Sequence, residues 1–307
     1  MADQHSSAHR QCGRHAIDNL PQIPLSQYKS HPRDWRQNLY VYPVISRRSG
    51  GLSIGINLNP DTACNFDCVY CQVDRTITPR VRDVDPNVMR AELEAMCDEA
   101  VSGRLFADPA FASVPSVLRV VKDMAFSGDG EPTTCKRFAE CVAICADVKR
   151  RAGLHEAQIV LITDACYLTR PGVVEGLRIL DANNGHIWAK LDAGTEAYYQ
   201  RVNRPNFPLA HVMENIITAA CERPVVIQSL FMRLDGEGPA ESEIAAFVGR
   251  LNEITEAGGS IQHVQIYTVA RKPAESFVSA LSDSEVDGIA DLVREKANLP
   301  VEAYYGV

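Results

Sequence analysis

Three cysteines, Cys64, Cys68 and Cys71, stand close together in the first quarter of the chain. Their spacing, C-x3-C-x2-C, puts three thiols on one short loop directly after a segment in which apolar and small or polar residues alternate. Cysteine thiolates are the usual ligands of iron–sulfur clusters, and three of them bind three irons of a cubane. The fourth iron then stays open to a substrate or cofactor. The spacing therefore predicts a [4Fe–4S] site at which a small molecule binds iron directly.

A structural zinc site is the alternative interpretation of the same cysteines. Such a site takes four Cys or His ligands at close spacing. The nearest downstream cysteine is Cys97, inside a segment with helical periodicity, and no histidine occurs between residues 32 and 154. These absences favour the iron–sulfur cluster, with zinc-binding or simply buried cysteines as the alternative.

Further candidate residues stand at the ends of other strand-like segments. Ser127–Thr133 reads Ser-Gly-Asp-Gly-Glu-Pro-Thr, and its glycines allow a ligand to approach the backbone closely. Thr163 and Asp164 end another segment, where they contact a ligand or cap a turn. Lys190 and Asp192 share one face of a third, and a buried charge without a partner would be costly. We expect a ligand-binding role for both pairs, with a structural pairing as the alternative.

The composition sets limits on the class of protein. The 307 residues are 46% hydrophobic and 23% charged, as in an ordinary globular protein. The net charge of -8 disfavours non-specific binding to nucleic acid. No apolar run is long enough to cross a bilayer, and the N-terminus lacks the apolar region of a secretion signal. Ten cysteines in such a chain predict reduced thiols and a cytoplasmic protein.

Strand-like and helix-like segments alternate from residue 52 onward. We expect strands at Leu52–Leu58, Val121–Phe126, Gln158–Thr163, His186–Leu191, Val225–Phe231 and His263–Val269. Helices are expected near 86–102, 135–152, 171–181, 209–222, 240–257 and 283–297. Asp85-Pro86 and Arg170-Pro171 resemble helix starts, and Gly153 and Gly258 resemble helix ends. Six such units in series predict a parallel sheet with right-handed crossovers.

The alternation within the strands distinguishes an open sheet from a barrel. Leu52, Ile54 and Ile56 share one face of the first strand, while Ser53 and Gly55 share the other. Strands buried on both faces would be continuously apolar. One polar face per strand instead predicts helices outside and a polar lumen inside. We therefore expect an α/β fold, a partial (β/α)6 barrel, with its chemistry at the carboxyl ends of the strands.

The expected domain organisation is simple. Residues 1–36 are polar, without a sustained period, and are expected to form a flexible N-terminal arm. Residues 37–307 are expected to form one core domain with a short C-terminal helical extension.

The cysteine motif, with Tyr70 before its last cysteine, resembles the signature of the radical S-adenosylmethionine (SAM) superfamily. Other segments resemble a subgroup related to wyosine (4-demethylwyosine) synthase. These segments, which span roughly residues 40–280, are Tyr42–Arg48, Gly55–Leu58, Cys64–Gln72, Phe126–Thr133, Lys190–Gly194, Arg201–Pro205 and Thr268–Glu275.

The resemblance implies specific roles for the candidate residues. Cys64, Cys68 and Cys71 would hold a [4Fe–4S] cluster whose open iron chelates SAM. One electron from a flavodoxin or ferredoxin-type reductant would cleave SAM into methionine and a 5′-deoxyadenosyl radical, which abstracts hydrogen from the substrate. The residues expected around SAM are Tyr70, Ser127, Gly128, Asp129, Gly130, Glu131, Thr163, Asp164, Lys190, Asp192 and Arg204.

The substrate stays open at this point, because a small metabolite, a modified nucleotide or tRNA, and a peptide all fit the sequence. Wyosine synthases carry a second cluster on three N-terminal cysteines, whereas only Cys12 precedes Cys64 here. A second cluster on Cys135, Cys141 and Cys145 is the less favoured interpretation, since isolated helical cysteines are usually small buried side chains. A tRNA-modifying enzyme and a non-catalytic iron–sulfur redox protein remain the alternatives.

Overall fold

An eight-stranded, mostly parallel sheet forms the centre of the computed structural model, which describes residues 26–29 and 35–306. The strand order is β1-β2-β3-β4-β5-β6-β8-β10. β1 pairs with β2 in the antiparallel direction, and all other neighbours in this sheet are parallel. The strands are β1 (Val41–Ser46), β2 (Gly51–Ile56), β3 (Val121–Phe126), β4 (Gln158–Thr163), β5 (Gly185–Lys190), β6 (Val225–Leu230), β8 (Ile261–Tyr267) and β10 (Val301–Tyr304).

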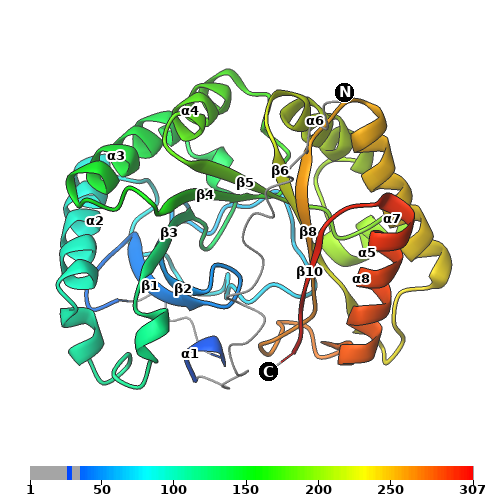
Figure 1. Ribbon diagram of the computed structural model, residues 1–307, viewed down its shortest axis with the longest axis horizontal. Helices are drawn as coiled ribbons and strands as arrows, with labels where there is room; N and C mark the ends of the chain where they lie inside the picture. Colours follow the sequence, from blue (N-terminus) through cyan, green and yellow to red (C-terminus); the bar gives the residue numbers. More distant parts are fainter. Residues whose placement is uncertain (1–25, 30–34, 307) are drawn as a thin grey trace, which may run out of the picture.

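Helices follow the parallel strands and cover the outer side of the curved sheet (Figure 1). The sheet curls into a half-barrel whose edge strands, β1 and β10, face each other across an opening. The helices are α1 (Ser26–Lys29), α2 (Pro86–Val101), α3 (Phe138–Arg151), α4 (Pro171–Asp181), α5 (Glu196–Asn203), α6 (Leu209–Glu222), α7 (Glu241–Glu256) and α8 (Asp283–Ala297). Three short 3-10 helices, η1 (Arg104–Ala107), η2 (Ser116–Leu118) and η3 (Pro132–Thr134), and a small antiparallel pair, β7 (Met232–Leu234) and β9 (Val278–Ala280), complete the elements.

The partial (β/α)6 barrel expected from the sequence is confirmed. The six parallel strands β2, β3, β4, β5, β6 and β8 neighbour one another in chain order, each followed by at least one helix. All six expected strands and all six expected helices form, with ends shifted by at most three residues. The expected arm, residues 1–36, and Cys12 lie almost entirely outside the described residues.

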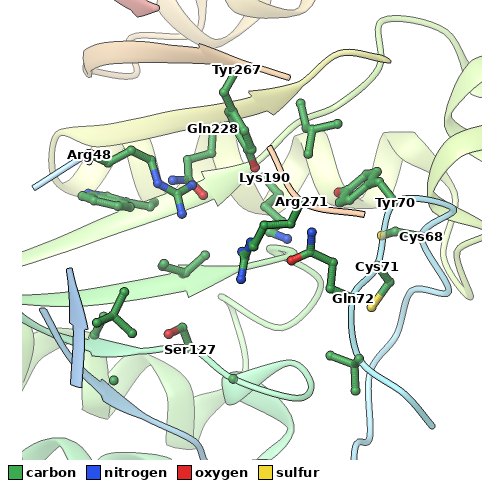
Figure 2. Close-up of a pocket in the computed structure, with 18 of the residues that line it drawn as sticks. Arg48, Cys68, Tyr70, Cys71, Gln72, Ser127, Lys190, Gln228, Tyr267 and Arg271 are labelled. Carbon is green, nitrogen blue, oxygen red and sulfur yellow. The ribbon is translucent and has the colours of Figure 1, made fainter. Parts of the chain in front are cut away.

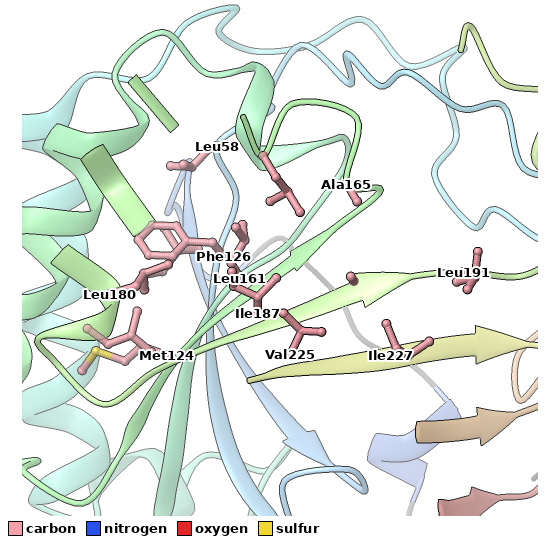
Figure 3. Close-up of a cluster of buried hydrophobic side chains, with 14 of the residues drawn as sticks. Leu58, Met124, Phe126, Leu161, Ala165, Leu180, Ile187, Leu191, Val225 and Ile227 are labelled. Atoms are coloured by element: carbon pink, nitrogen blue, oxygen red, sulfur yellow. The ribbon is translucent and has the colours of Figure 1, made fainter. Parts of the chain in front are cut away.

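Alternation along the strands produces the two faces of the sheet. Apolar side chains such as Met124, Phe126 and Leu161 are fully buried against the helices (Figure 3). The opposite face carries polar side chains, including Ser53, Lys190 and Gln228, which line a cavity in the lumen. The polar inner face inferred from the sequence is therefore confirmed.

Local signals in the sequence set the helix boundaries. The Asp85 carboxylate accepts a hydrogen bond from the Asn87 amide (2.9 Å) at the start of α2, and Pro171 occupies the first turn of α4. Gly153 and Gly258 follow α3 and α7 with φ of +70° and +88°, a conformation that glycine adopts without strain. No helix within the described ranges is long and apolar enough to cross a membrane.

Candidate functional site

A cavity of about 320 Å³ lies in the lumen, and its lining includes the residues at the carboxyl ends of the strands (Figure 2). Twelve of the fourteen residues expected to bind the cluster or SAM are in its lining. They are Cys64, Cys68, Tyr70, Cys71, Ser127, Gly128, Asp129, Gly130, Glu131, Thr163, Asp164 and Lys190. The two others, Asp192 and Arg204, lie outside the lining.

The cysteine loop is fastened to the end of α5 by its backbone. The Asp67 amide donates to the Asn203 carbonyl (3.0 Å), and the Val69 amide donates to the Val202 carbonyl (3.0 Å). Within the loop, the Cys71 amide donates to the Cys68 carbonyl (2.9 Å). These bonds fix the loop on the side of the cavity where β5 ends.

Two of the loop's thiols receive hydrogen bonds from side chains. Asn203 Nδ2 donates to Cys68 Sγ (3.4 Å), and Arg75 Nη1 donates to Cys71 Sγ (3.6 Å). Burial raises the pKa of Cys64 to about 11 and that of Cys68 to about 12, so both thiols stay protonated unless a cation compensates the thiolate charge. Bound iron supplies such a charge.

The donor set fits a [4Fe–4S] cluster. In the described part of the chain, no three His, Cys, Asp or Glu side chains gather around the position of a single metal ion. A cubane places each thiolate on a different iron, so its ligands do not need to converge on one point. Three half-buried thiols on one loop, two of them with N–H donors, meet the requirements of such a cluster.

The glycine loop after β3 packs directly on the cysteine loop. A Cβ atom added at Gly130 would lie 1.9 Å from the Ala63 carbonyl oxygen, and one added at Gly128 would lie 2.4 Å from Asn57 Oδ1. The Glu131 amide donates to the Ala63 carbonyl (3.0 Å). Only glycine allows this approach, so the two loops form one continuous wall of the cavity.

Asn57, which follows the last residue of β2, is hydrogen-bonded to the same glycine loop. Its Nδ2 donates to Asp129 Oδ2 (2.6 Å), and its Oδ1 accepts from the Asp129 amide (3.2 Å). The Asp129 carboxylate therefore accepts a hydrogen bond from a side chain beside the cavity wall.

Glu131 joins the ends of β3 and β4. Its carboxylate is 3% exposed and accepts from Thr163 Oγ1 (2.7 Å), the Asp164 amide (2.7 Å) and both donors of Thr133 (2.5 and 3.0 Å). Burial and the nearby Glu131 raise the pKa of Asp164 well above its usual value. The Glu131 and Thr163 side chains thus fix the wall, while the backbone of residues 128–130 faces the cavity.

Asp192 stands behind Tyr70. The Tyr70 hydroxyl donates to Asp192 Oδ2, which also accepts from Asn203 Nδ2 (2.9 Å), and Asp192 Oδ1 accepts from the Leu230 amide (2.9 Å). Lys190 Nζ lies 5.7 Å from the centre of the Tyr70 ring. Asp192 therefore positions the tyrosine of the cysteine motif, and Lys190 supplies a cation in the cavity beside it.

Arg204 does not line the cavity. Its guanidinium pairs with Glu275 (2.7 Å) and Asp67 (3.6 Å), with a side chain 41% exposed. It therefore ties the segment after α5 to the loop after β8 and to the cysteine loop.

The cysteines that follow the glycine loop are mostly core residues. Cys141 and Cys145 are fully buried in α3, and Cys145 Sγ donates to Met124 Sδ (3.5 Å). Cys135 is half-buried after η3. These placements match the interpretation of helical cysteines as packing residues.

Other residues of the cavity were not among the site residues expected from the sequence. Tyr267 lies on the polar face that alternation predicts for β8, and Gln228 lies on the inner face of β6, where the same alternation could have identified it. Arg48 and Arg271 come from a turn and a loop, where no periodicity indicates direction. Figure 2 shows Arg48, Lys190 and Arg271 around the same space.

Comparisons with known proteins give distant relationships. No protein-family model matches the chain. A UPF0026 protein of Methanocaldococcus jannaschii is 28% identical over 182 residues, 57% of this chain and 46% of the relative. The GTPase Obg of Brachyspira hyodysenteriae is 21% identical over 301 residues, 94% of this chain and 38% of the relative. The chain thus spans less than half the length of either curated relative.

Among solved structures, the chain is similar to an archaeal TYW1, with a TM-score of 0.44 and 14% identity, over 81% of this chain and 72% of that one. It is also similar to BtrN in complex with AdoMet and 2-DOIA, with a TM-score of 0.28 and 18% identity, over 48% of this chain and 49% of that one.

Proposed function

We propose that this chain is a radical SAM enzyme, in which Cys64, Cys68 and Cys71 hold a [4Fe–4S] cluster and the cavity binds SAM. The observation that carries the proposal is the junction of two loops at the carboxyl ends of the strands. The three-cysteine loop and the glycine loop share a hydrogen bond between Glu131 and Ala63 (3.0 Å) and bound one cavity. Such loops are the usual place for chemistry in a (β/α) barrel.

The charges around the cavity suit the two ends of SAM. Lys190 offers a cation to the carboxylate of the methionyl group. Burial lowers the pKa of Lys190, but the nearby Tyr267, Cys68 and Asp192 raise it by more than burial lowers it, so the net shift of this pKa is upward. Exposed backbone groups in residues 128–130 offer hydrogen bonds to the methionyl amine.

When bound, the cluster and SAM together supply a 5′-deoxyadenosyl radical after one-electron reduction, with cleavage of the S–C5′ bond and release of methionine. The protein orients SAM and excludes water from the cavity. A flavodoxin or ferredoxin-type reductant is the proposed electron donor. Asp192 and Asn203 keep Tyr70 and the cysteine loop in place through their hydrogen bonds.

The test is anaerobic reconstitution with iron and sulfide, followed by dithionite and SAM. We expect about four irons per chain and formation of 5′-deoxyadenosine, both lost in Cys68→Ala. Cys221→Ala is the matched control, because Cys221 is exposed at the end of α6 and donates to the Ala257 carbonyl, away from the cavity.

Three results would contradict the proposal. Zinc in place of iron would indicate a structural metal site. Iron without 5′-deoxyadenosine above the Cys68→Ala level would indicate a redox protein. Equal activity of Cys68→Ala and Cys221→Ala would remove the cysteine loop from the reaction.

A further inference from the structure

A second group of polar side chains occupies the lumen on the side of the cavity away from the cysteine loop. We call Arg48, Trp188, Gln228 and Tyr267 the lumen floor. Arg48 and Trp188 line both the cavity described above and a second one of about 520 Å³, which contains residues from the amino ends of the strands, such as Gln158 and His186. The lumen floor therefore lies between the two cavities.

Arg48 is held by aromatic rings. The guanidinium carbon lies 5.8 Å from the centre of the Trp188 ring and 5.2 Å from that of Tyr267. Contacts at this range are cation–π interactions, which orient the guanidinium and leave its N–H groups for an oxyanion. No ion pair joins the Arg48 guanidinium to an acid in the described part of the chain.

Three acids in the lining of the cavity already accept hydrogen bonds. Asp123 accepts one from Ser53; burial raises its pKa and the nearby Arg48 lowers it, so Arg48 attracts this carboxyl without forming a close ion pair with it. Asp129 is bound by Asn57, and Glu131 is bound by four donors. Arg48 therefore keeps its hydrogen-bonding capacity for a ligand.

Gln228 adds an acceptor at the same place. The side chain is 0% exposed, and its Nε2 donates to Gln265 Oε1 (2.8 Å). Its Oε1 has no hydrogen-bond partner among the described residues. A buried acceptor without a partner is destabilising, so this atom marks a place where a ligand donor would be favourable. Figure 2 shows the Gln228 amide beside the Arg48 guanidinium, with Tyr267 above them.

We propose that the lumen floor binds a substrate carrying an oxyanion, a carboxylate or a phosphate, next to a hydroxyl or amino group. Arg48 binds the oxyanion, and Gln228 Oε1 accepts a hydrogen bond from the neighbouring group. The proposal rests on the function proposed above only in calling the ligand a substrate; the binding site itself needs neither cluster nor SAM. Lys190, which lies beside the Tyr70 ring, remains for the carboxylate of SAM.

Trp188 offers a direct readout of this site. The chain has two tryptophans, and the other, Trp35, packs edge-on against Phe111 and lines neither cavity. In a Trp35→Phe background of the full chain, fluorescence reports Trp188 alone. The probes are acetate and glycolate, which differ by one hydroxyl group, and ethyl phosphate and 2-hydroxyethyl phosphate, which differ by one hydroxyl group as well. Calorimetry of the reconstituted protein gives a second measurement.

We expect saturable binding of glycolate or 2-hydroxyethyl phosphate, tighter than that of acetate or ethyl phosphate. Arg48→Gln should weaken this binding at least about tenfold, since a hydrogen bond to a charged group is lost. Gln228→Met should remove the preference for the hydroxylated probe. Arg137→Gln, the same charge change at the exposed start of α3, should leave binding unchanged. If the carboxylate probes bind more tightly than the phosphate probes, the oxyanion is a carboxylate; the reverse order identifies a phosphate.

The proposal is overturned if no probe gives saturable binding, or if Arg48→Gln and Arg137→Gln bind alike. Should Arg48→Gln not fold, Arg48→Lys keeps the charge but lacks the planar fork, and unchanged affinity in that variant overturns the proposal equally. Probe binding without 5′-deoxyadenosine formation would refute the proposed enzyme and leave this site standing. SAM cleavage without probe binding would refute only the lumen floor.

Discussion

The buried side-chain amide of Asn203 lies within hydrogen-bonding distance of three groups. Its Nδ2 lies 2.9 Å from Asp192 Oδ2, 3.4 Å from Cys68 Sγ and 3.5 Å from the Tyr70 hydroxyl oxygen. The residue is 1% exposed and is the last of α5. One amide thus connects a thiol of the proposed cluster with the carboxylate that positions Tyr70. The residue is therefore suited to adjusting the electronic state of the cluster without binding it.

Replacement of this amide should shift the cluster potential. In Asn203→Ala the Cys68 sulfur loses an N–H donor. Hydrogen bonds to cluster sulfurs stabilise the reduced cluster, which carries one more negative charge, so losing such a bond lowers the potential. We expect iron content close to that of the wild type and a more negative midpoint potential, measured by redox titration followed with electron paramagnetic resonance.

Asn206→Ala is the matched control for this prediction. Asn206 is exposed on the segment after α5, and its backbone amide donates a hydrogen bond to the Asn65 carbonyl (3.0 Å). A purely structural role for Asn203 would lower iron content and leave the potential of the remaining cluster unchanged. Equal potentials in the two variants would contradict the prediction.

At the scale of elements, the site depends on close packing between the ends of neighbouring strands. The cysteine loop leaves β2, the glycine loop leaves β3, and Glu131 binds the end of β4. Parallel pairing of these strands brings all three ends to the same edge of the sheet. The geometry of the site is therefore a consequence of strand order together with two residues that lack a side chain.

Gly130→Ala should separate the two loops. The added Cβ would overlap the Ala63 carbonyl oxygen, which belongs to the backbone and cannot turn aside. Overpacking of this kind costs about 1–3 kcal/mol. We expect the free energy of unfolding in urea to fall by about that amount, and iron content after reconstitution to fall with it, since Ala63 precedes Cys64.

Gly172→Ala provides the comparison for a harmless glycine replacement. A Cβ at Gly172, in the first turn of α4, would meet no atom within 4 Å. Alanine is the better helix former, so unfolding free energy should stay equal or rise by up to about 1 kcal/mol. If Gly130→Ala behaved like Gly172→Ala, the proposed contact between the loops would be wrong.

Sequence periodicity predicts the inner strands of the sheet, in which apolar and polar residues alternate. It does not predict the two edge strands, β1 and β10. β1 contains Pro43, which is tolerated because β1 is an edge strand, and β10 has only four residues. Neither shows a clear period, and neither was expected. The cysteine and glycine loops were predictable because short motifs specify them. Arg48 was not, since its direction depends on rings from β5 and β8 that only the folded chain brings together.

For the whole molecule, the edge strands determine how the lumen is closed. The turn between β1 and β2 reaches the C-terminal strand across the opening of the half-barrel (Figure 1). Arg47 Nη1 donates to the Tyr305 carbonyl (2.8 Å), and the Tyr304 hydroxyl donates to the Arg48 carbonyl (3.4 Å). These are side-chain bonds to backbone groups, where a closed barrel would have strand pairing. The closure is thus held by few contacts beside the lumen floor.

Arg47→Ala should loosen this closure without unfolding the core. It removes the bond to Tyr305 and the contact of the guanidinium with the Tyr28 ring, whose centre lies 5.7 Å away. A charged donor of this kind contributes about 1.5 kcal/mol, which corresponds to roughly tenfold faster local opening. We expect hydrogen exchange of the β10 amides to accelerate by that factor, while β3 and β4 exchange as in the wild type.

Arg151→Ala, a loss of the same charge on the exposed end of α3, should change neither region. Uniform acceleration across the sheet would show instead that the turn supports global stability, and unchanged β10 exchange would show that the sheet stays closed without it.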